Sequence, residues 1–99
     1  METSRYKSYV YVLTNDFGNV MYVGSTDDLK TRLYQHKTHL IPGFTEKYRI
    51  SKLVYFEEHP DEVAALMREK QIKGKTGAKK NRIVESMNPE WKDLSAIVV

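Results

Sequence analysis

Two short runs of β-branched and aromatic residues near the start of the chain constrain its fold most. Residues 9–13 read YVYVL and residues 20–25 read VMYVGS, and the segment between them, TNDFGN, is rich in turn-forming residues. Such runs favour strands, and a short polar connection favours antiparallel pairing. The sequence therefore predicts a β-hairpin. Because side chains alternate along a strand, Tyr11 and Tyr22 would share one face of this hairpin if the register permits.

Further elements are expected after the hairpin. A helix is predicted over residues 26–38, because Ser25 and Asp28 fit a capping box. Residues 38–51 show no clean period and include a Pro-Gly pair, which indicates a loop, whereas residues 52–58 (KLVYFEE) predict a third strand. Two more helices are predicted: residues 60–74, where Val63, Leu66, Met67 and Ile72 recur at helical spacing, and residues 78–87.

The length of 99 residues allows a single domain over residues 1–99 with one modest core. The start lacks the apolar segment of a signal peptide, and every apolar run is too short to cross a bilayer, so we expect a cytoplasmic protein with no membrane partner. The absence of cysteine excludes disulfides and thiolate zinc sites. Motifs for acyl transfer and for nucleotide hydrolysis are also absent from the sequence.

Positive charge is concentrated in one segment. The net charge is only +3, but residues 68–82 hold seven basic residues against the single acid Glu69. Such a block suits a polyanion such as nucleic acid, for which the candidate contacts are Lys70, Lys73, Lys75, Lys79, Lys80 and Arg82. From charge alone, a solvated lysine-rich face that binds nothing specific is an equally good interpretation.

The predicted first helix carries two unusual residues on its inward side. Leu29, Arg32, Leu33 and His36 lie at positions i, i+3, i+4 and i+7. An unpaired buried charge is costly, so Arg32 and His36 must either reach the rim of the core or face an anionic partner. A guanidinium is well shaped to hold a phosphate, and an imidazole exchanges protons near neutral pH. The alternative is that only the two leucines face inward and that Arg32 and His36 lie on a solvated flank.

Glu69 raises a similar question in the next helix. Its helical neighbours Ala65, Leu66 and Ile72 are apolar, so the carboxylate belongs to a partly apolar face and needs a cation. The cation is either a divalent metal, since Mg²⁺ accepts one or two protein carboxylates, or Lys73 at the favourable i+4 position.

An ordered set of these residues resembles a known family. The tripeptide YVY at residues 9–11 is followed by YVG at residues 22–24, then by Arg32, by His36 four residues later, and by the glutamate of MREKQIKG. This order is similar to that of the GIY-YIG nucleases, including the nuclease domain at the start of the bacterial excision-repair subunit that makes the incision. The resemblance covers nearly the whole chain. It implies an α+β fold with a three-stranded antiparallel β-sheet flanked by helices, in the order β-β-α-β-α-α, which agrees with the elements predicted above.

The resemblance also assigns roles to individual residues. Tyr11 would position or deprotonate the attacking water, and Tyr22 would hydrogen-bond the nucleophile or the phosphate. His36 matches a position near the nucleophile, so either Tyr11 or His36 is the general base. Gly24 would let the backbone pack closely where a Cβ could not fit.

The implied activity is that of a metal-dependent endonuclease cutting DNA in repair or DNA processing. Arg32 would stabilise charge on the phosphate in the transition state, and Glu69 would hold one divalent ion, Mg²⁺ or Mn²⁺. No organic cofactor is implied. Many relatives carry an asparagine shortly after a proline, and here Lys92 stands at the aligned place while Asn88 stands just before the proline.

Two other functional classes are compatible with the sequence. One is a nucleic-acid-binding module of the same fold without catalytic activity, which would bind DNA in a salt-sensitive way and cleave nothing. The other is a protein-interaction domain that uses its basic face on an acidic partner, which would bind no nucleic acid even at low salt.

Overall fold

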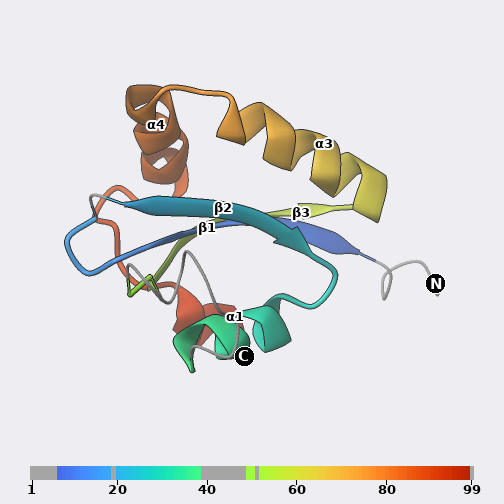
Figure 1. Ribbon diagram of the computed structural model, residues 1–99, viewed down its shortest axis with the longest axis horizontal. Coiled ribbons are helices and arrows are strands. Elements are labelled where there is room, and N and C mark those ends of the chain that lie inside the picture. The colour runs from blue at the N-terminus through green and yellow to red at the C-terminus, as the bar shows by residue number, and fades with distance from the viewer. Residues whose placement is uncertain (1–6, 19, 39–48, 51, 99) are drawn as a thin grey trace.

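The structure is a computed structural model that describes residues 7–18, 20–38, 49–50 and 52–98. Its strands and helices follow one another in the predicted order, β-β-α-β-α-α, and a short 3-10 helix that the sequence did not indicate follows at the end (Figure 1). The elements are β1 Ser8–Thr14, β2 Met21–Thr26, α1 Leu29–Lys37, β3 Lys52–His59, α3 Glu62–Lys73, α4 Gly77–Met87 and η2 Ser95–Val98. The predicted loop at residues 38–51 falls mostly outside the described residues.

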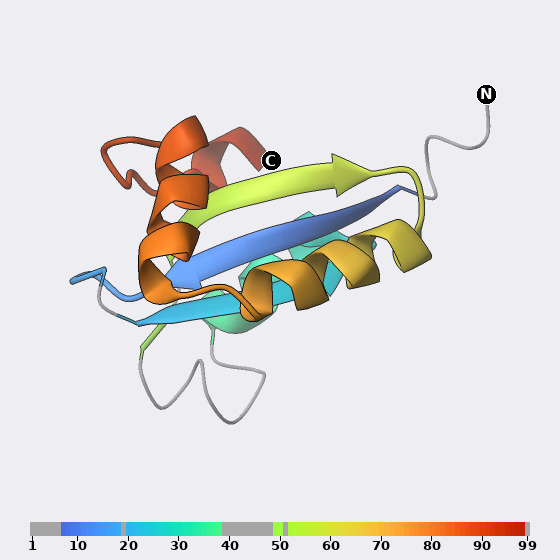
Figure 2. The same cartoon turned by 90° about the horizontal axis from the view of Figure 1, so that it is seen from above.

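The three strands form one antiparallel sheet in the order β2-β1-β3, which confirms the predicted α+β fold. Helices α3 and α4 cover one face of the sheet, and α1 and η2 lie on the other face (Figures 1 and 2). The strand β1 is therefore central both within the sheet and between the two helical layers. This position explains why six of its seven residues are buried.

Apolar side chains pack on both faces of the sheet. On the α3 and α4 side the buried cluster consists of Val10, Val12, Val23, Val54, Tyr55, Ala65, Ile72 and Val84. On the α1 side it consists of Tyr11, Leu13, Leu29, Leu33, Ile50 and Leu53, with Tyr9 and Tyr22 among the partly buried residues against it. Tyr11 and Tyr22 share the α1 side, as the alternation of side chains along the hairpin predicted.

The first helix begins later than predicted. Asp28 is the N-cap of α1, and its carboxylate accepts a hydrogen bond from the backbone N–H of Thr31 at 3.1 Å. Ser25 is not part of a capping box, because it continues strand β2 opposite Val10. The carboxylate of Asp28, three residues nearer to the helix, supplies the acceptor instead, so Ser25 is available for another contact.

The inward face of α3 also differs from the prediction. The helix begins at Glu62 after the N-cap Asp61, and its buried residues are Ala65 and Ile72. Three of the four apolar residues expected at helical spacing are exposed: Val63, Leu66 and Met67. The helix is rotated in this way because two polar residues, Arg68 and Glu69, make contacts with the sheet. Among the described residues, no helix is both long and apolar enough to span a membrane.

Candidate catalytic site

The side chain of Tyr11 lies over a glycine of the edge strand. Tyr11 pairs with Gly24 in the β1–β2 ladder. A Cβ built at Gly24 would be 2.6 Å from the Tyr11 hydroxyl oxygen and 3.1 Å from Cε2 of Tyr22. Atoms do not approach a Cβ as closely as 2.6 Å without displacement, so residue 24 must be glycine if the phenol is to occupy this place.

Tyr11, Tyr22 and His36 form a cluster of three rings. The ring centroids of Tyr11 and Tyr22 are 6.2 Å apart, and that of His36 is 5.9 Å from the first and 5.4 Å from the second. The Tyr11 hydroxyl and Nε2 of His36 are 3.3 Å apart, within hydrogen-bonding distance. His36 is only 1% exposed. The interpretation that places it on a solvated flank is therefore wrong, whereas Arg32 is partly exposed.

The surroundings of this cluster control its protonation. Burial, together with Tyr22, raises the pKa of Tyr11 well above its ordinary value, although Arg32 opposes this change through its charge and as a hydrogen-bond donor. Burial lowers the pKa of His36, and the positive charge of Arg32 lowers it further. At neutral pH the phenol is therefore protonated and the imidazole is neutral.

Glu69 lies on the other face of the sheet, on helix α3. Its Oε1 accepts a hydrogen bond from the Ser25 hydroxyl at 2.6 Å, and Lys73 Nζ lies 2.6 Å from its Oε2. Although burial acts to raise the pKa of Glu69, these hydrogen bonds and the charges of Lys73 and Lys70 keep it below its ordinary value. The Glu69–Lys73 ion pair that the i+4 spacing allowed is thus present.

The edge strand β2 joins the two halves of the site. Gly24 accommodates the Tyr11 phenol on one face of the sheet, and the next residue, Ser25, holds Glu69 on the other. The two halves are close enough for the Glu69 charge to raise the pKa of Tyr11. Sequence reasoning did not assign Ser25 to the site. The alternation of side chains along β2 places Ser25 on the face opposite to that of Tyr22, but it does not identify Glu69 on α3 as its partner.

The five predicted residues do not form an open patch. Tyr11 is 0% and His36 is 1% exposed, so the hydroxyl and the imidazole lie beneath the surface. Tyr22, Arg32 and Glu69 are partly exposed. A substrate would therefore meet these three side chains first.

The chemistry around Glu69 fits one weakly held divalent cation. A cationic group, the ammonium of Lys73, already lies against Oε2. The Lys73 side chain is 51% exposed, whereas that of Glu69 is 13% exposed, so the lysine has room to move away. Among the described residues, no three His, Cys, Asp or Glu side chains form a cluster that could hold a metal. A single carboxylate suits Mg²⁺, which retains water ligands and takes others from substrate phosphates.

Asn88 is buried and joins the turn after α4 to strand β3 through hydrogen bonds. It is 5% exposed, and its Nδ2 donates to the carbonyl oxygens of Val54 at 3.0 Å and Lys92 at 2.7 Å. Its Oδ1 accepts from the backbone N–H of Lys92 at 3.0 Å. Asn88 thus fastens the turn after α4 to strand β3, while the Lys92 ammonium lies outside, paired with Glu90.

The basic segment follows the C-terminal half of α3 and helix α4, on the same face of the sheet as Glu69 (Figure 2). Lys75 and Lys80 are partly buried, and the others are exposed: Lys70, Lys73, Lys79 and Arg82. Lys73 is engaged by Glu69. Of the remaining basic residues, Lys70 lies on α3, Lys75 lies between the two helices, and Lys79, Lys80 and Arg82 lie on α4.

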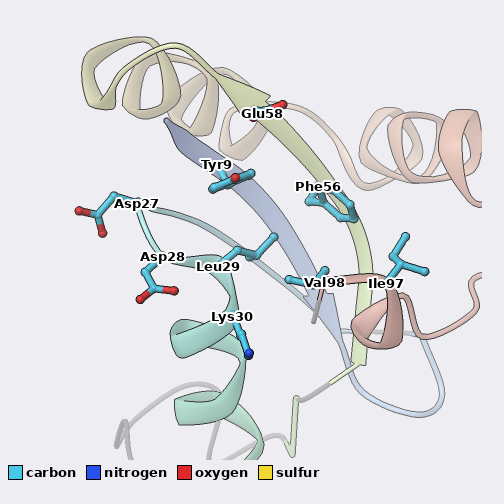
Figure 3. A pocket seen from close by; sticks show the side chains of 9 residues that line it. All are labelled: Tyr9, Asp27, Asp28, Leu29, Lys30, Phe56, Glu58, Ile97 and Val98. Carbon is cyan, nitrogen blue, oxygen red and sulfur yellow. The ribbon is translucent and has the colours of Figure 1, made fainter. Parts of the chain in front are cut away.

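A hollow of about 430 Å³ lies elsewhere, beside the start of α1. Tyr9, Leu29, Phe56 and Val98 surround it, and Asp27 and Asp28 lie at its rim (Figure 3). None of the five predicted catalytic residues lines it. Carboxylates repel phosphate groups, so this hollow is a poor place for a nucleic-acid backbone.

A second polar cluster connects α3 with β3. Arg68 Nε donates to both carboxylate oxygens of Glu57 at 3.1 Å, and its Nη1 donates to Gln71. Tyr55 and His59 also hydrogen-bond to Glu57. Sequence reasoning did not find this cluster, because Tyr55, Glu57 and His59 alternate along β3 whereas Arg68 comes from α3, and only the packing of α3 brings it to them.

Comparisons with known proteins agree with this fold and motif order. The GIY-YIG catalytic domain family model matches residues 7–82. A UPF0213 protein of Streptococcus sanguinis (strain SK36) is 37% identical over 70 residues, which cover 71% of this chain and 79% of that protein. The solution NMR structure of a UPF0213 protein from Bacillus halodurans has a TM-score of 0.57 at 24% identity and supports the fold alone, covering 88% of this chain and 92% of the other. The family match spans both tyrosine motifs and the glutamate that meets them across the edge strand, so this chain belongs to the GIY-YIG catalytic domain family.

Proposed function

We propose that this protein is an endonuclease that hydrolyses phosphodiester bonds in DNA with the help of one divalent metal ion, Mg²⁺ or Mn²⁺, and acts in DNA repair or processing. The observation that carries the proposal is the arrangement around Gly24. There the Tyr11 hydroxyl lies 3.3 Å from His36 Nε2 and responds electrostatically to both Arg32 and Glu69. Phosphodiester hydrolysis uses a proton acceptor and a cation near the nucleophile, as His36 and Arg32 are near this hydroxyl, and a carboxylate such as Glu69, which lies across the edge strand.

The proton path follows from the two perturbed groups. The Tyr11 phenol is a weak acid here because burial raises its pKa, so a phenolate is not the resting form. The His36 imidazole is neutral, and in the tautomer that carries its proton on Nδ1 the Nε2 atom can accept the phenol proton. We propose that Tyr11 takes a proton from the attacking water while it passes its own proton to His36. The water oxygen then bonds to phosphorus, the bond between phosphorus and the leaving oxygen breaks, and the leaving oxygen takes a proton from solvent.

The remaining residues act on the phosphate. The Arg32 guanidinium can donate to a non-bridging oxygen and stabilise its growing negative charge. Tyr22, partly exposed beside Tyr11, can hydrogen-bond the nucleophile or the phosphate. Glu69 would hold the metal ion, which would supply positive charge against the negative charge that develops during hydrolysis. The basic residues of α3 and α4 would bind the DNA backbone regardless of its sequence.

The test is nicking of plasmid and branched DNA with Mg²⁺ or Mn²⁺. Arg32→Ala should reduce the cleavage rate by about 10²- to 10³-fold, since it removes a charged donor to the transition state. Glu69→Gln should remove the metal dependence together with the activity. Lys30→Ala on the same helix as Arg32 is the matched control and should cleave at the wild-type rate. Wild-type activity in both the Arg32 and the Glu69 variants would exclude this site.

A DNA-binding module without catalysis is the second candidate. The burial of Tyr11 and His36 and the pairing of Glu69 with Lys73 favour it, because each reduces access to a group needed for chemistry. It predicts salt-dependent DNA binding with no cleavage by the wild-type protein in either metal.

A further inference from the structure

We propose that Ser25 is a positioning residue that fixes the Glu69 carboxylate in the orientation needed to hold a divalent cation. The inference rests on the metal role of Glu69 in the proposed function. It adds a residue to which neither the motif order nor the family match assigns a role.

The two oxygens of the carboxylate have different partners. Oε1 accepts from the Ser25 hydroxyl at 2.6 Å, and Oε2 faces the Lys73 ammonium at 2.6 Å. A distance of 2.6 Å is typical of a hydroxyl donating to a charged carboxylate. Because the lysine side chain is half exposed, a metal ion can replace it, whereas Ser25 belongs to the sheet.

The direction of the Ser25 side chain is fixed by strand pairing. Ser25 lies opposite Val10 in the β1–β2 ladder, next to the Tyr11–Gly24 pair. Since successive side chains point to opposite faces, the phenol over Gly24 on one face places the Ser25 hydroxyl on the other. The same two residues thereby set the distance between the Tyr11 and Glu69 halves of the site.

The helix that carries Glu69 is held from the opposite edge as well. Arg68, the preceding residue, makes a two-pronged contact with Glu57 on β3 at 3.0–3.1 Å. Consecutive residues of α3 are therefore bound to the two edge strands of the sheet. With the rotation of α3 fixed in this way, Ser25 determines which oxygen of Glu69 remains available to a cation.

Hydrogen-bond donors to a metal-ligating carboxylate usually affect metal affinity strongly. Loss of such a partner commonly reduces affinity by about 10- to 100-fold. Ser25→Ala removes one hydroxyl and leaves the strand pairing intact, so the expected effect is weaker metal binding in a folded protein. Ser25→Thr keeps a hydroxyl and should restore most of the affinity.

The test uses Mn²⁺ alone as the probe with the full-length ¹⁵N-labelled protein. Paramagnetic broadening of the amide signals near Glu69 gives the Mn²⁺ concentration at half-effect. We expect Ser25→Ala to raise this concentration by about 10-fold or more, Ser25→Thr to stay near wild type and Glu69→Gln to lose the broadening. The metal concentration for half-maximal DNA cleavage should shift in parallel, with a smaller change in the maximal rate.

Ser95→Ala is the matched control, because the Ser95 hydroxyl also donates to a carboxylate, that of Asp93, at 2.6 Å. It should bind Mn²⁺ as the wild type does. Unchanged Mn²⁺ binding in Ser25→Ala, with loss in Glu69→Gln, would refute the role of Ser25 and leave the proposed function standing. Unchanged broadening in Glu69→Gln, or none in the wild type, would refute the metal role of Glu69 and this inference with it.

Discussion

Tyr11 and Gly24 lie opposite each other in the β1–β2 ladder, and the phenol of the first occupies the space that a Cβ on the second would need. The contact is steric and does not depend on an unusual backbone angle. It connects the packing of the sheet directly with the position of the hydroxyl at the centre of the candidate site.

Gly24→Ala should therefore damage both stability and catalysis. Its Cβ would come within 2.6 Å of the Tyr11 hydroxyl oxygen, and a buried ring has little room to move. We expect a loss of about 1–3 kcal/mol in the free energy of unfolding and about a 10²-fold lower cleavage rate. Urea denaturation and nicking assays check this. Gly77→Ala is the control, since nothing lies within 4 Å of its Cβ position; equal effects in both variants would contradict the steric account.

The free energy of unfolding should depend on pH through His36. Burial lowers its pKa below the ordinary 6.5, so below about pH 6.5 the unfolded chain binds a proton that the folded protein does not. Stability should fall as the pH decreases through this range, and His36→Gln should flatten the dependence. Urea denaturation at about pH 7.5 and 5.5 measures it. The same slope in both proteins would show that His36 is not the group responsible.

Glu57→Gln should loosen the contact between α3 and β3. The Glu57 side chain is 17% exposed and accepts from Arg68, Tyr55 and His59, so we expect a loss of about 2 kcal/mol at neutral pH. Burial acts to raise the pKa of Glu57, but the hydrogen bonds lower it by more, so the pKa stays below the ordinary 4.5. The contribution of Glu57 to the free energy of unfolding is therefore present above pH 4.5 and is lost as the carboxylate is protonated in acid. Denaturation at several pH values tests this.

A control for the Glu57 experiment is available in an exposed ion pair. Glu90→Gln breaks the contact with Lys92, whose side chain is 72% exposed, and should change stability by less than about 0.5 kcal/mol. A similar loss in both variants would argue against a special role for the Glu57 cluster.

Asn88→Asp should lower stability and leave catalysis by folded molecules unchanged. The substitution places a carboxylate oxygen against the carbonyl oxygens of Val54 and Lys92, where Asn88 has a donor. We expect a loss of about 3 kcal/mol. Cleavage rates corrected for the folded fraction separate the two effects, and a large fall in the corrected rate would instead assign Asn88 to the catalytic machinery.

DNA binding should depend on salt through the basic face of α4. Lys79→Ala and Arg82→Ala should each reduce the slope of log K against log salt concentration by about 0.9, because each removes one phosphate contact. Fluorescence anisotropy between about 50 and 200 mM salt measures the slope. Lys30→Ala, beside the acidic hollow near α1, should leave the slope unchanged. A decrease in slope as large as in the α4 variants would indicate that DNA also binds near α1.

The sequence by itself determined the strands, the order of the elements and the shared face of Tyr11 and Tyr22. These depend on local preferences and on the two-residue period of a strand, which nearby residues set. The sequence also predicted that Glu69 pairs with either a divalent metal or Lys73, and the ion pair with Lys73 is present.

Only the tertiary structure decided which way α3 faces. Its apolar residues predicted an inward face that includes Leu66 and Met67, yet these are exposed because Arg68 and Glu69 bind the two edge strands. Contacts between residues as far apart in the chain as Ser25 and Glu69 depend on the packing of helix against sheet. Local periodicity contains no information about that packing, because it specifies the faces of each element and not their partners.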